Sequence, residues 1–329
     1  MSLMSPRERS DRVKNLALEL GFDGCGIARA QPMPRGDYVQ HWLSAGRAGS
    51  MRYLHEHLSE RLDPTILLPD ARSIIMLARL YHQPEPVLAS DGSASQRGGR
   101  IAMYAWGEDY HRVIREKVHL LVEQLQKQLG EPFDYRVCVD TAPIVERQWA
   151  EMAGIGWIGK NTLVLSERLG SYFFLAALVT TIELEADEPV EDHCGSCTAC
   201  LDACPTKAFP APYEMDASRC ISFLTIEHRG EIPANLRESV GDWLFGCDVC
   251  QQVCPFNRKA PVTTEARFTP RTAVILDPDP VLNWSRGDYR RNLGGTAMTR
   301  ATLAMWWRNA AIVAENLTKA DQRAHGSAS

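Results

Sequence analysis

The sequence has no long hydrophobic run, no apolar leader and no excess of positive charge. No stretch reaches the roughly 18 apolar residues that a membrane-spanning helix needs, and the most apolar segment, 172–182, has the length of one buried strand. Residues 1–12 contain no apolar core before a small-residue cleavage site, so we expect a reducing cytoplasm rather than secretion. The net charge of −5 gives no basic field over the whole surface, although a local basic patch stays open. These absences exclude a membrane protein.

Ten cysteines in a reducing compartment need an explanation other than disulfides. The run CGSCTACLDACP at 194–205 has the C-x2-C-x2-C-x3-C-P spacing of bacterial ferredoxins. A second run, CDVCQQVCP at 247–255, repeats the last three positions, and Cys220 lies upstream as a fourth thiolate. Eight thiolates in this pattern predict two [4Fe-4S] clusters.

The spacing also predicts which cysteines share a cluster. Three thiolates in one tight loop bind three irons of a cube, and in two-cluster ferredoxins the cysteine before proline crosses over to the other cube. We therefore expect two neighbouring centres. The first is assigned Cys194, Cys197, Cys200 and Cys254, and the second Cys204, Cys220, Cys247 and Cys250.

Structural zinc is the alternative, because paired C-x2-C motifs also form four-thiolate zinc sites. Three cysteines within seven residues and two CP endings favour a cube instead. Cys25 and Cys138 lie outside both runs, in apolar or strand-like surroundings, and we expect them to be small buried side chains without a role.

About 190 residues precede the cysteine runs, more than a simple electron carrier needs. Their hydrophobic periodicity alternates between helix and strand, which predicts an α/β domain, with a site at the carboxyl edge of a parallel sheet. The expected helices are 12–20, 38–45, 51–58, 109–129 and 143–152, and the expected strands 26–28, 73–81, 133–139, 162–165 and 172–182.

Composition divides the chain further. Residues 85–100 are rich in Pro, Gly and Ser and predict a loop, and 183–192 form an acidic linker. We expect a mixed α+β and α/β protein with an α/β domain at 1–183, a ferredoxin-like two-cluster domain at 184–260 and a short helical C-terminal segment at 261–329. Its last helix, 301–317, carries Trp306 and Trp307, which we expect in the core.

The letters G-x-G-x-x-G occur at 154–159, but they follow an expected helix rather than a strand, so a dinucleotide site is not favoured. The D-x-H-x-x-G loop that supplies a histidine to a corrinoid is absent as well. Composition and spacing alone therefore predict an iron–sulfur oxidoreductase.

Four further motifs occur in order with the cysteine runs: YAWGEDYH at 104–111, VDTAPIVER at 139–147, GWIGKNT at 156–162 and RNAA at 308–311. Together they resemble the epoxyqueuosine reductase family over nearly the whole chain. That family reduces the epoxide of epoxyqueuosine at the wobble position of tRNA, the last step of queuosine biosynthesis, with cobalamin and two [4Fe-4S] clusters. The resemblance implies this reaction here and makes residues 1–183 the cobalamin-binding catalytic domain. It also implies a monomer that binds tRNA and receives electrons, through the clusters to cob(I)alamin, from a ferredoxin or flavodoxin.

The resemblance makes Asp140 the proton donor to the opening epoxide, with a pKa raised by an apolar pocket. Capping of the helix near Pro143 is the alternative role for this carboxylate. The cobalamin contacts that it implies are Arg61, Met103, Asp140, Ser222, Cys247 and Asp248. Candidate tRNA contacts are His228, Arg229 and, within 286–291, Arg286, Arg290 and Arg291.

Three other functions stay open at this point. A corrinoid iron–sulfur enzyme related to reductive dehalogenases would act on a small electrophile. An electron-transfer ferredoxin would need no site at Asp140, and a tRNA-binding protein with inert clusters would show no turnover.

Overall fold

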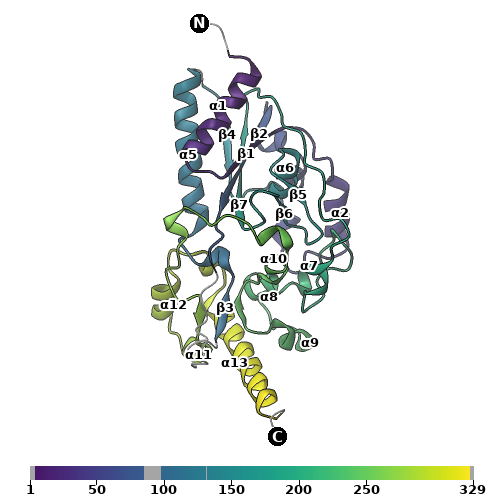
Figure 1. Cartoon of the computed structure of the whole chain (residues 1–329), viewed down its shortest axis with the longest axis vertical. Helices are drawn as coiled ribbons and strands as arrows, with labels where there is room; N and C mark the ends of the chain where they lie inside the picture. The colour runs from purple at the N-terminus through teal and green to yellow at the C-terminus, as the bar shows by residue number, and fades with distance from the viewer. Residues whose placement is uncertain (1–3, 85–97, 131, 327–329) are drawn as a thin grey trace.

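A four-stranded sheet organises the first half of the chain (Figure 1). In this computed structural model, which describes residues 4–84, 98–130 and 132–326, the strand order is β1-β2-β7-β4. The strands are β1 (Gly24–Arg29), β2 (Ser73–Leu80), β7 (Phe173–Thr180) and β4 (Tyr135–Cys138). Every pairing in this sheet is antiparallel, so the expected parallel sheet is wrong. Alternation of helices and strands does not fix strand direction, because connections as long as 30–72 can return the chain to either edge.

Helices cover both faces of the sheet. Helices α1 (Pro6–Glu19) and α5 (Tyr110–Leu129) pack on one face and α6 (Glu146–Met152) on the other, which leaves β2 buried at every position. A capping box between Ser5 and Glu8 begins α1. Asp109 caps α5, and Gly130, with φ 68°, ends it. The helix expected at 109–129 is confirmed, because its caps and apolar stripe are local signals. The helix expected at 12–20 is present but begins earlier, at Pro6, because the capping box extends it toward the N-terminus.

Three other expectations differ from the structure. Residues 51–58 do not form one helix: a 3-10 turn at Arg52–Leu54 is followed, after the left-handed His57 (φ 52°), by α3 (Leu58–Leu62) and α4 (Pro64–Leu67). The helix expected from 143 begins at Glu146. The expected loop 85–100 lies largely outside the described residues, and its end forms β3 (Gly99–Ile101). Helix α2 (Gly36–Ser44) lies where expected.

The cysteine runs lie on short helices and turns. Helix α7 (Ala199–Asp202) is part of the first run and α10 (Val249–Gln252) part of the second. Between them lie α8 (Ile221–Ile226) and α9 (Ala234–Arg237). A two-stranded ribbon of β5 (Trp157–Ile158) and β6 (Val164–Leu165) precedes the first run.

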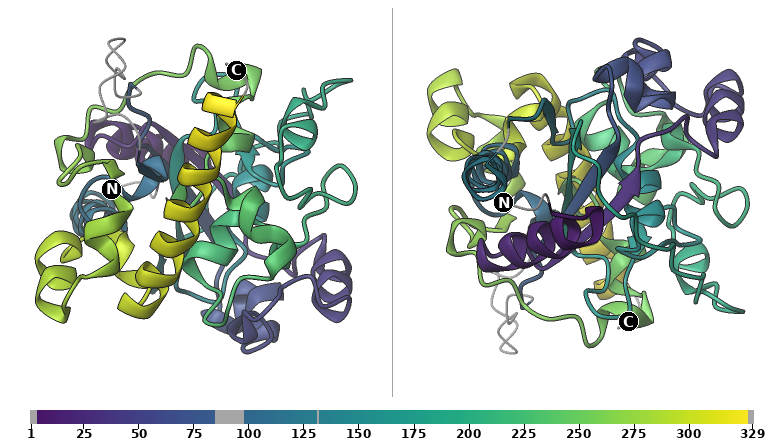
Figure 2. Two further views of the ribbon diagram at one scale, coloured as in Figure 1. Left: turned by 90° about the horizontal axis from the view of Figure 1, so that it is seen from below. Right: turned by 90° about the horizontal axis from the view of Figure 1, so that it is seen from above.

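The C-terminal segment is part of the main core rather than a tail. A three-stranded sheet in the order β8-β3-β9 takes one strand from each expected segment, with β8 at Trp243–Phe245 and β9 at Ile275–Leu276. Helices α11 (Pro278–Leu282), α12 (Arg286–Leu293) and α13 (Leu303–Gly326) follow, and Figure 2 shows α13 running across one end of the molecule.

Aromatic packing anchors α13 in this core. Trp306 is fully buried and stacks on Phe245 with 5.7 Å between ring centroids. Trp307 is 41% exposed, so the expectation of a core role is wrong for it, because it occupies the neighbouring position on the helix surface. Within the described ranges, no helix is both long enough and apolar enough to cross a membrane.

Candidate functional site

The structure brings the eight clustered cysteines into two groups of four. Cys200 interacts electrostatically with Cys254, Cys194 and Cys197, and burial is the main cause that raises its pKa to about 11. Cys247 interacts in the same way with Cys220 and Cys204.

The remaining thiol, Cys250, completes the second group. It interacts with Cys247 and Cys220, and also with Cys200 of the first group, so the two groups are neighbours. This grouping agrees with the assignment made from the spacing. We call the group of Cys194, Cys197, Cys200 and Cys254 the first centre, and the group of Cys204, Cys220, Cys247 and Cys250 the second centre.

The donor set fits iron–sulfur clusters. Burial raises the pKa of most of these thiols, so without cations they hold protons at neutral pH, and iron would displace those protons. The main-chain N–H of Ala208 lies 3.3 Å from Cys204 Sγ, a hydrogen bond of the kind that supports a cluster thiolate. Cys25 and Cys138 lie apart, and burial raises the pKa of each to about 12.

Asp140 lies directly after β4 in the left-handed region, with φ 58°. Its Oδ2 accepts a hydrogen bond from His111 Nε2 at 3.1 Å, and His111 Nδ1 lies 2.6 Å from Asp109 Oδ1. Because carboxylates only accept, the ring must carry a proton on both nitrogens to make both bonds. Burial opposes that charge, but the hydrogen bonds to Asp109 and Asp140 outweigh it and raise the pKa of His111 to about 9.

The two carboxyl groups at this site have opposite pKa shifts. Burial raises the pKa of Asp140, but the hydrogen bond and charge of His111 outweigh burial and give a net lowering, so the expected raised pKa is wrong. Burial raises the pKa of Glu146 to about 8, and its Oε1 accepts the main-chain N–H of Asp140 at 2.8 Å. The capping alternative is wrong too, because α6 has Val145 at its N-cap and no side-chain cap. Glu146 is therefore the carboxyl that holds a proton at neutral pH.

Aromatic and basic side chains surround Asp140. Tyr104 and Tyr110 are near it, and burial raises the pKa of both phenols far above the ordinary value. Arg61 and Arg300 interact with Asp140 electrostatically. Arg300 also forms two hydrogen bonds with Glu227, of 2.7 and 2.8 Å. The side of the site near these arginines is therefore suited to a charged ligand.

The expected cobalamin contacts lie on two sides of this region. Met103 N donates to Asp248 Oδ2 at 2.7 Å, and Asp248 is 5% exposed. Gly246, with φ 72°, turns the chain from β8 into the second run, where an added Cβ would come within 2.4 Å of Ala102 Cβ. Tyr104 interacts with both Asp140 and Asp248.

The second centre therefore lies beside the Asp140 site. Cys247 precedes Asp248 and packs in the same apolar cluster as Tyr104. Ser222 follows Cys220 in α8, and its main-chain N–H is hydrogen-bonded to that thiol. Arg61 lies on the opposite side, next to Asp140, and its Nε is buried with no hydrogen-bond partner among the described residues.

A pocket beside Tyr53 and Arg300 contains two of the candidate tRNA contacts, His228 and Arg229. Tyr289 of α12 donates to the carbonyl oxygens of Thr299 and Ala301 at 3.0 and 2.9 Å, which places that helix next to Arg300. The exposed Arg286, Arg290 and Arg291 are on this helix. The structure thus places α12 close to Arg300, which lines the same pocket as His228 and Arg229.

The RNAA motif binds the main chain of the loop that carries His228 and Arg229. Arg308 donates to the carbonyl oxygens of Leu224 and His228, each at 2.6 Å, and to that of Gly230. Asn309 donates to Thr225 O and Leu244 O, each at 2.9 Å. These residues hold the 224–230 loop in place.

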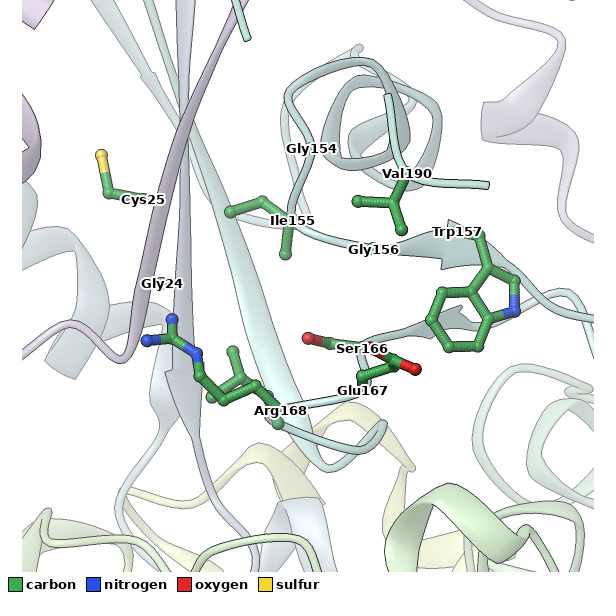
Figure 3. A pocket seen from close by; sticks show the side chains of 11 residues that line it. Gly24, Cys25, Gly154, Ile155, Gly156, Trp157, Ser166, Glu167, Arg168 and Val190 are labelled. Carbon is green, nitrogen blue, oxygen red and sulfur yellow. The ribbon is translucent and has the colours of Figure 1, made fainter. Parts of the chain in front are cut away.

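A second pocket lies on the far side of the first centre (Figure 3). Its lining includes Cys25, Glu167, Arg168 and Trp157. Trp157 packs in one apolar cluster with Cys254 and Cys194, so its indole separates this pocket from the first centre. The G-x-G-x-x-G letters lie along this wall and run from α6 into β5, which is not the strand-to-helix turn of a dinucleotide site.

Two four-thiol groups and a carboxylate site beside one of them define an iron–sulfur oxidoreductase with a mixed α/β fold. The family model "4Fe-4S double cluster binding domain" matches residues 193–257, and "Epoxyqueuosine reductase QueG, DUF1730" matches residues 61–141. An epoxyqueuosine reductase of Pseudomonas aeruginosa is 40% identical over 314 residues, which cover 95% of this chain and 86% of the relative. This chain belongs to the epoxyqueuosine reductase family.

Solved structures agree with that assignment. A crystal structure of epoxyqueuosine reductase with an epoxyqueuosine-modified tRNA-Tyr stem loop is similar with a TM-score of 0.87 and 32% identity, over 95% of this chain and 82% of that one. The enzyme from Bacillus subtilis, described with its aspartate-bearing catalytic loop swung out of the active site, has a TM-score of 0.85 and 31% identity, over 96% and 84%.

Sequence reasoning missed the groups around Asp140. His111 and Glu146 stood within quoted motifs but received no role, and their spacing to Asp140 carries no signal that is readable without the fold. Arg300 and Tyr53 lie in no motif, and only the tertiary structure brings them to the site.

Proposed function

We propose that this protein reduces epoxyqueuosine to queuosine in tRNA. The observation that carries the proposal is the Asp140–His111 pair beside the second of two four-cysteine centres. Family membership supports the reaction, and the solved relative with an epoxyqueuosine-modified stem loop supports a tRNA substrate. We retain the division at 1–183, 184–260 and 261–329 as a proposal, with the cobalamin site on the first part.

The residues present fit a cobalamin between Arg61 and the second centre. Arg61 Nε is a buried donor in need of an acceptor, and Asp248 and Met103 form a joined wall opposite it. Ser222 and Cys247 would complete that wall on the side of the second centre. When bound, cobalamin would supply the reducing cobalt chemistry at the epoxide carbon.

Asp140 would deliver the proton to the oxygen released from the epoxide. Its lowered pKa makes it a poor reservoir, so we assign the reservoir to His111, whose pKa of about 9 keeps it protonated at neutral pH. Asp109 fixes the ring from the other side. Glu146, through its hydrogen bond to Asp140 N, holds the left-handed backbone that aims the carboxylate. Reduction then consumes two electrons and two protons and releases water.

Electrons would enter at the first centre and leave from the second. The first centre includes the exposed Cys197, whereas the second adjoins Asp140 through Tyr104 and Asp248. A ferredoxin or flavodoxin is the donor class that we propose. Since tRNA is the substrate, we propose a cytoplasmic monomer that binds the anticodon arm with His228, Arg229 and the arginines of α12.

The test is anaerobic reconstitution of the full chain with iron, sulfide and cobalamin, followed by incubation with epoxyqueuosine-containing tRNA and nucleoside mass spectrometry. Queuosine that forms only with cobalamin and a reductant supports the proposal. Stable cobalamin binding with no conversion would overturn it and favour a small halogenated or other electrophile as substrate. Two clusters without cobalamin binding would leave an electron-transfer protein.

A further inference from the structure

The GWIGKNT motif has no part in the proposed chemistry at Asp140, yet it contacts both cysteine runs. Trp157, in β5, is 1% exposed. Its ring meets His193 at 5.0 Å and Phe256 at 4.9 Å, both edge to face. These two rings flank Cys194 and Cys254, so Trp157 is fixed against the first centre from both ends of its ligand set.

The indole of Trp157 lies beside Cys194 and Cys254 of that centre. In Figure 3 the nitrogen lies on the side of the ring facing away from the other labelled side chains of the pocket. It is buried and has no hydrogen-bond partner within the described residues. Burial raises the pKa of Cys194, and the neighbouring Trp157 side chain and Lys160 main chain counteract that rise.

Lys160 brings a buried cation to the same loop. Its Nζ lies 2.6 Å from Gly195 O and 3.0 Å from Cys197 O, and the residue is 9% exposed. Asn161 Nδ2 lies 3.5 Å from Cys250 O, so the motif also reaches the second run. Asp192, which is exposed, lies near enough to Lys160 to offset part of its charge.

The second centre has different charges around it. The carboxylate of Asp248, 5% exposed, interacts with both Cys247 and Cys250. Among the cations near it, Arg147 interacts with Cys220 from an exposed position, where solvent screens the charge. Another of these cations, the half-buried Arg219, donates to Thr206 O at 2.9 Å. A buried cation thus adjoins one centre and a buried carboxylate the other.

We propose that Trp157 and Lys160 raise the reduction potential of the first centre above that of the second. The inference rests on the proposed function insofar as it takes the two groups to hold iron–sulfur clusters. Reduction adds one negative charge to a cluster, and N–H donors and a nearby cation stabilise that charge most where water is excluded. The first centre then accepts an electron from a weak donor, and the second centre, beside Asp248, is the stronger reductant of the two and passes electrons on.

The experiment is an EPR-monitored redox titration of the reconstituted full chain, with the signal of the first centre identified by Cys197→Ser. Lys160→Met should make the first centre at least tenfold harder to reduce, a shift of about 59 mV to lower potential for a one-electron couple. Trp157→Phe, which keeps the ring and loses the N–H, should shift it the same way by less. The second centre should move little in either variant.

Three controls separate an effect on the reduction potential from an effect on folding. Lys160→Arg keeps the charge and should keep most of the wild-type potential of the first centre. Asp192→Asn removes a negative charge and should raise that potential, by little because the carboxylate is exposed. Lys259→Met removes an exposed cation near Cys254 and should change nothing.

An unchanged potential in Lys160→Met, with the iron of both clusters retained, would overturn the proposal. If Lys160→Met loses its cluster, an unchanged potential in Trp157→Phe overturns it instead. Failure of the proposed function looks different: two titratable clusters with no conversion of tRNA would contradict the reductase activity alone.

Discussion

The two cysteine centres have the same ligands and different surroundings. The first lies behind Trp157, includes the exposed Cys197 and has the buried Lys160 cation against its loop. The second adjoins the Asp140 site and has the buried Asp248 carboxylate as its neighbour. Because charge and solvent near a cluster set its potential, identical thiolates can serve one centre for electron entry and the other for delivery. The proton transfer that we propose for Asp140 belongs to the second side.

Among variants that test the difference between the two centres, we expect the largest effect from Asp140→Asn. An amide cannot relay a proton from His111, so epoxide reduction should fall by about 10²–10⁴-fold. Both cluster potentials should stay at wild-type values, because the change is confined to the side of proton chemistry. Nucleoside mass spectrometry measures the epoxide reduction, and EPR-monitored titration measures the two cluster potentials. Near-normal turnover would contradict the role of Asp140.

Removal of Arg308 tests whether the tRNA surface depends on support from α13. Arg308→Ala leaves the carbonyl oxygens of the buried Leu224, the half-buried His228 and the exposed Gly230 without their donor and should cost about 1–3 kcal/mol of stability. The measurement is thermal unfolding of the reconstituted protein. Arg72→Ala, which removes an exposed ion pair with Glu183, should cost under about 1 kcal/mol. Equal losses in the two variants would contradict an anchoring role.

Glu146→Gln tests the protonated carboxyl beside Asp140. The pKa of Glu146 is raised to about 8 in the folded protein, above an unfolded value of about 4.3. Its contribution to stability is therefore full below about pH 4 and is lost as the pH rises through 8, by up to about 1.4 kcal/mol per pH unit. The variant should lack this decline in thermal unfolding between pH 5 and 8.

The matched control is a carboxylate that lines the pocket near the first centre. Glu167→Gln removes an exposed carboxylate at the pocket near the first centre and should keep the wild-type pH dependence. An identical decline in Glu146→Gln and wild type would contradict the assignment of the bound proton to Glu146.

The smallest effect is expected from the basic surface. Replacement of Arg286, Arg290 and Arg291 by alanine should weaken tRNA binding by about tenfold or less at physiological salt and reduce its salt dependence. The same change at Arg7, Arg9 and Arg12 of α1, at the opposite end of the molecule from α12 (Figure 1), removes equal charge and should leave affinity unchanged. Equal affinity of wild type and the α12 variant would show that these three arginines do not contribute to tRNA binding.

Local signals predicted much of the fold. The apolar stripe of α1 predicted that helix but placed its start six residues late, the caps and stripe of α5 predicted that helix in full, and the apolar residues at 73–81 predicted β2. The predicted parallel direction of the strands was wrong, since strand direction depends on where long connections re-enter the sheet. The helix expected at 51–58 was wrong because His57 adopts a left-handed conformation that its sequence neighbours do not require.

The candidate site also has a part that local sequence predicted and a part that it did not. Cysteine spacing alone predicted the pairing of runs into two centres, because loop geometry limits which thiolates reach one cube. The pKa of Asp140 could not be predicted, since it depends on His111, 29 positions away in the sequence. The protonated Glu146, the Arg300–Glu227 pair and the Lys160 cation were not foreseen, because each depends on burial and on partners from other segments.

The sequence by itself determined the candidate ligands, the order of the motifs and the family, because these are properties of residue identity and spacing. Only the tertiary structure decided which charge stands beside which centre and which carboxyl holds the proton. The physical reason is that electrostatic energies depend on distance and on exclusion of water, and both are set by segments that meet only after folding.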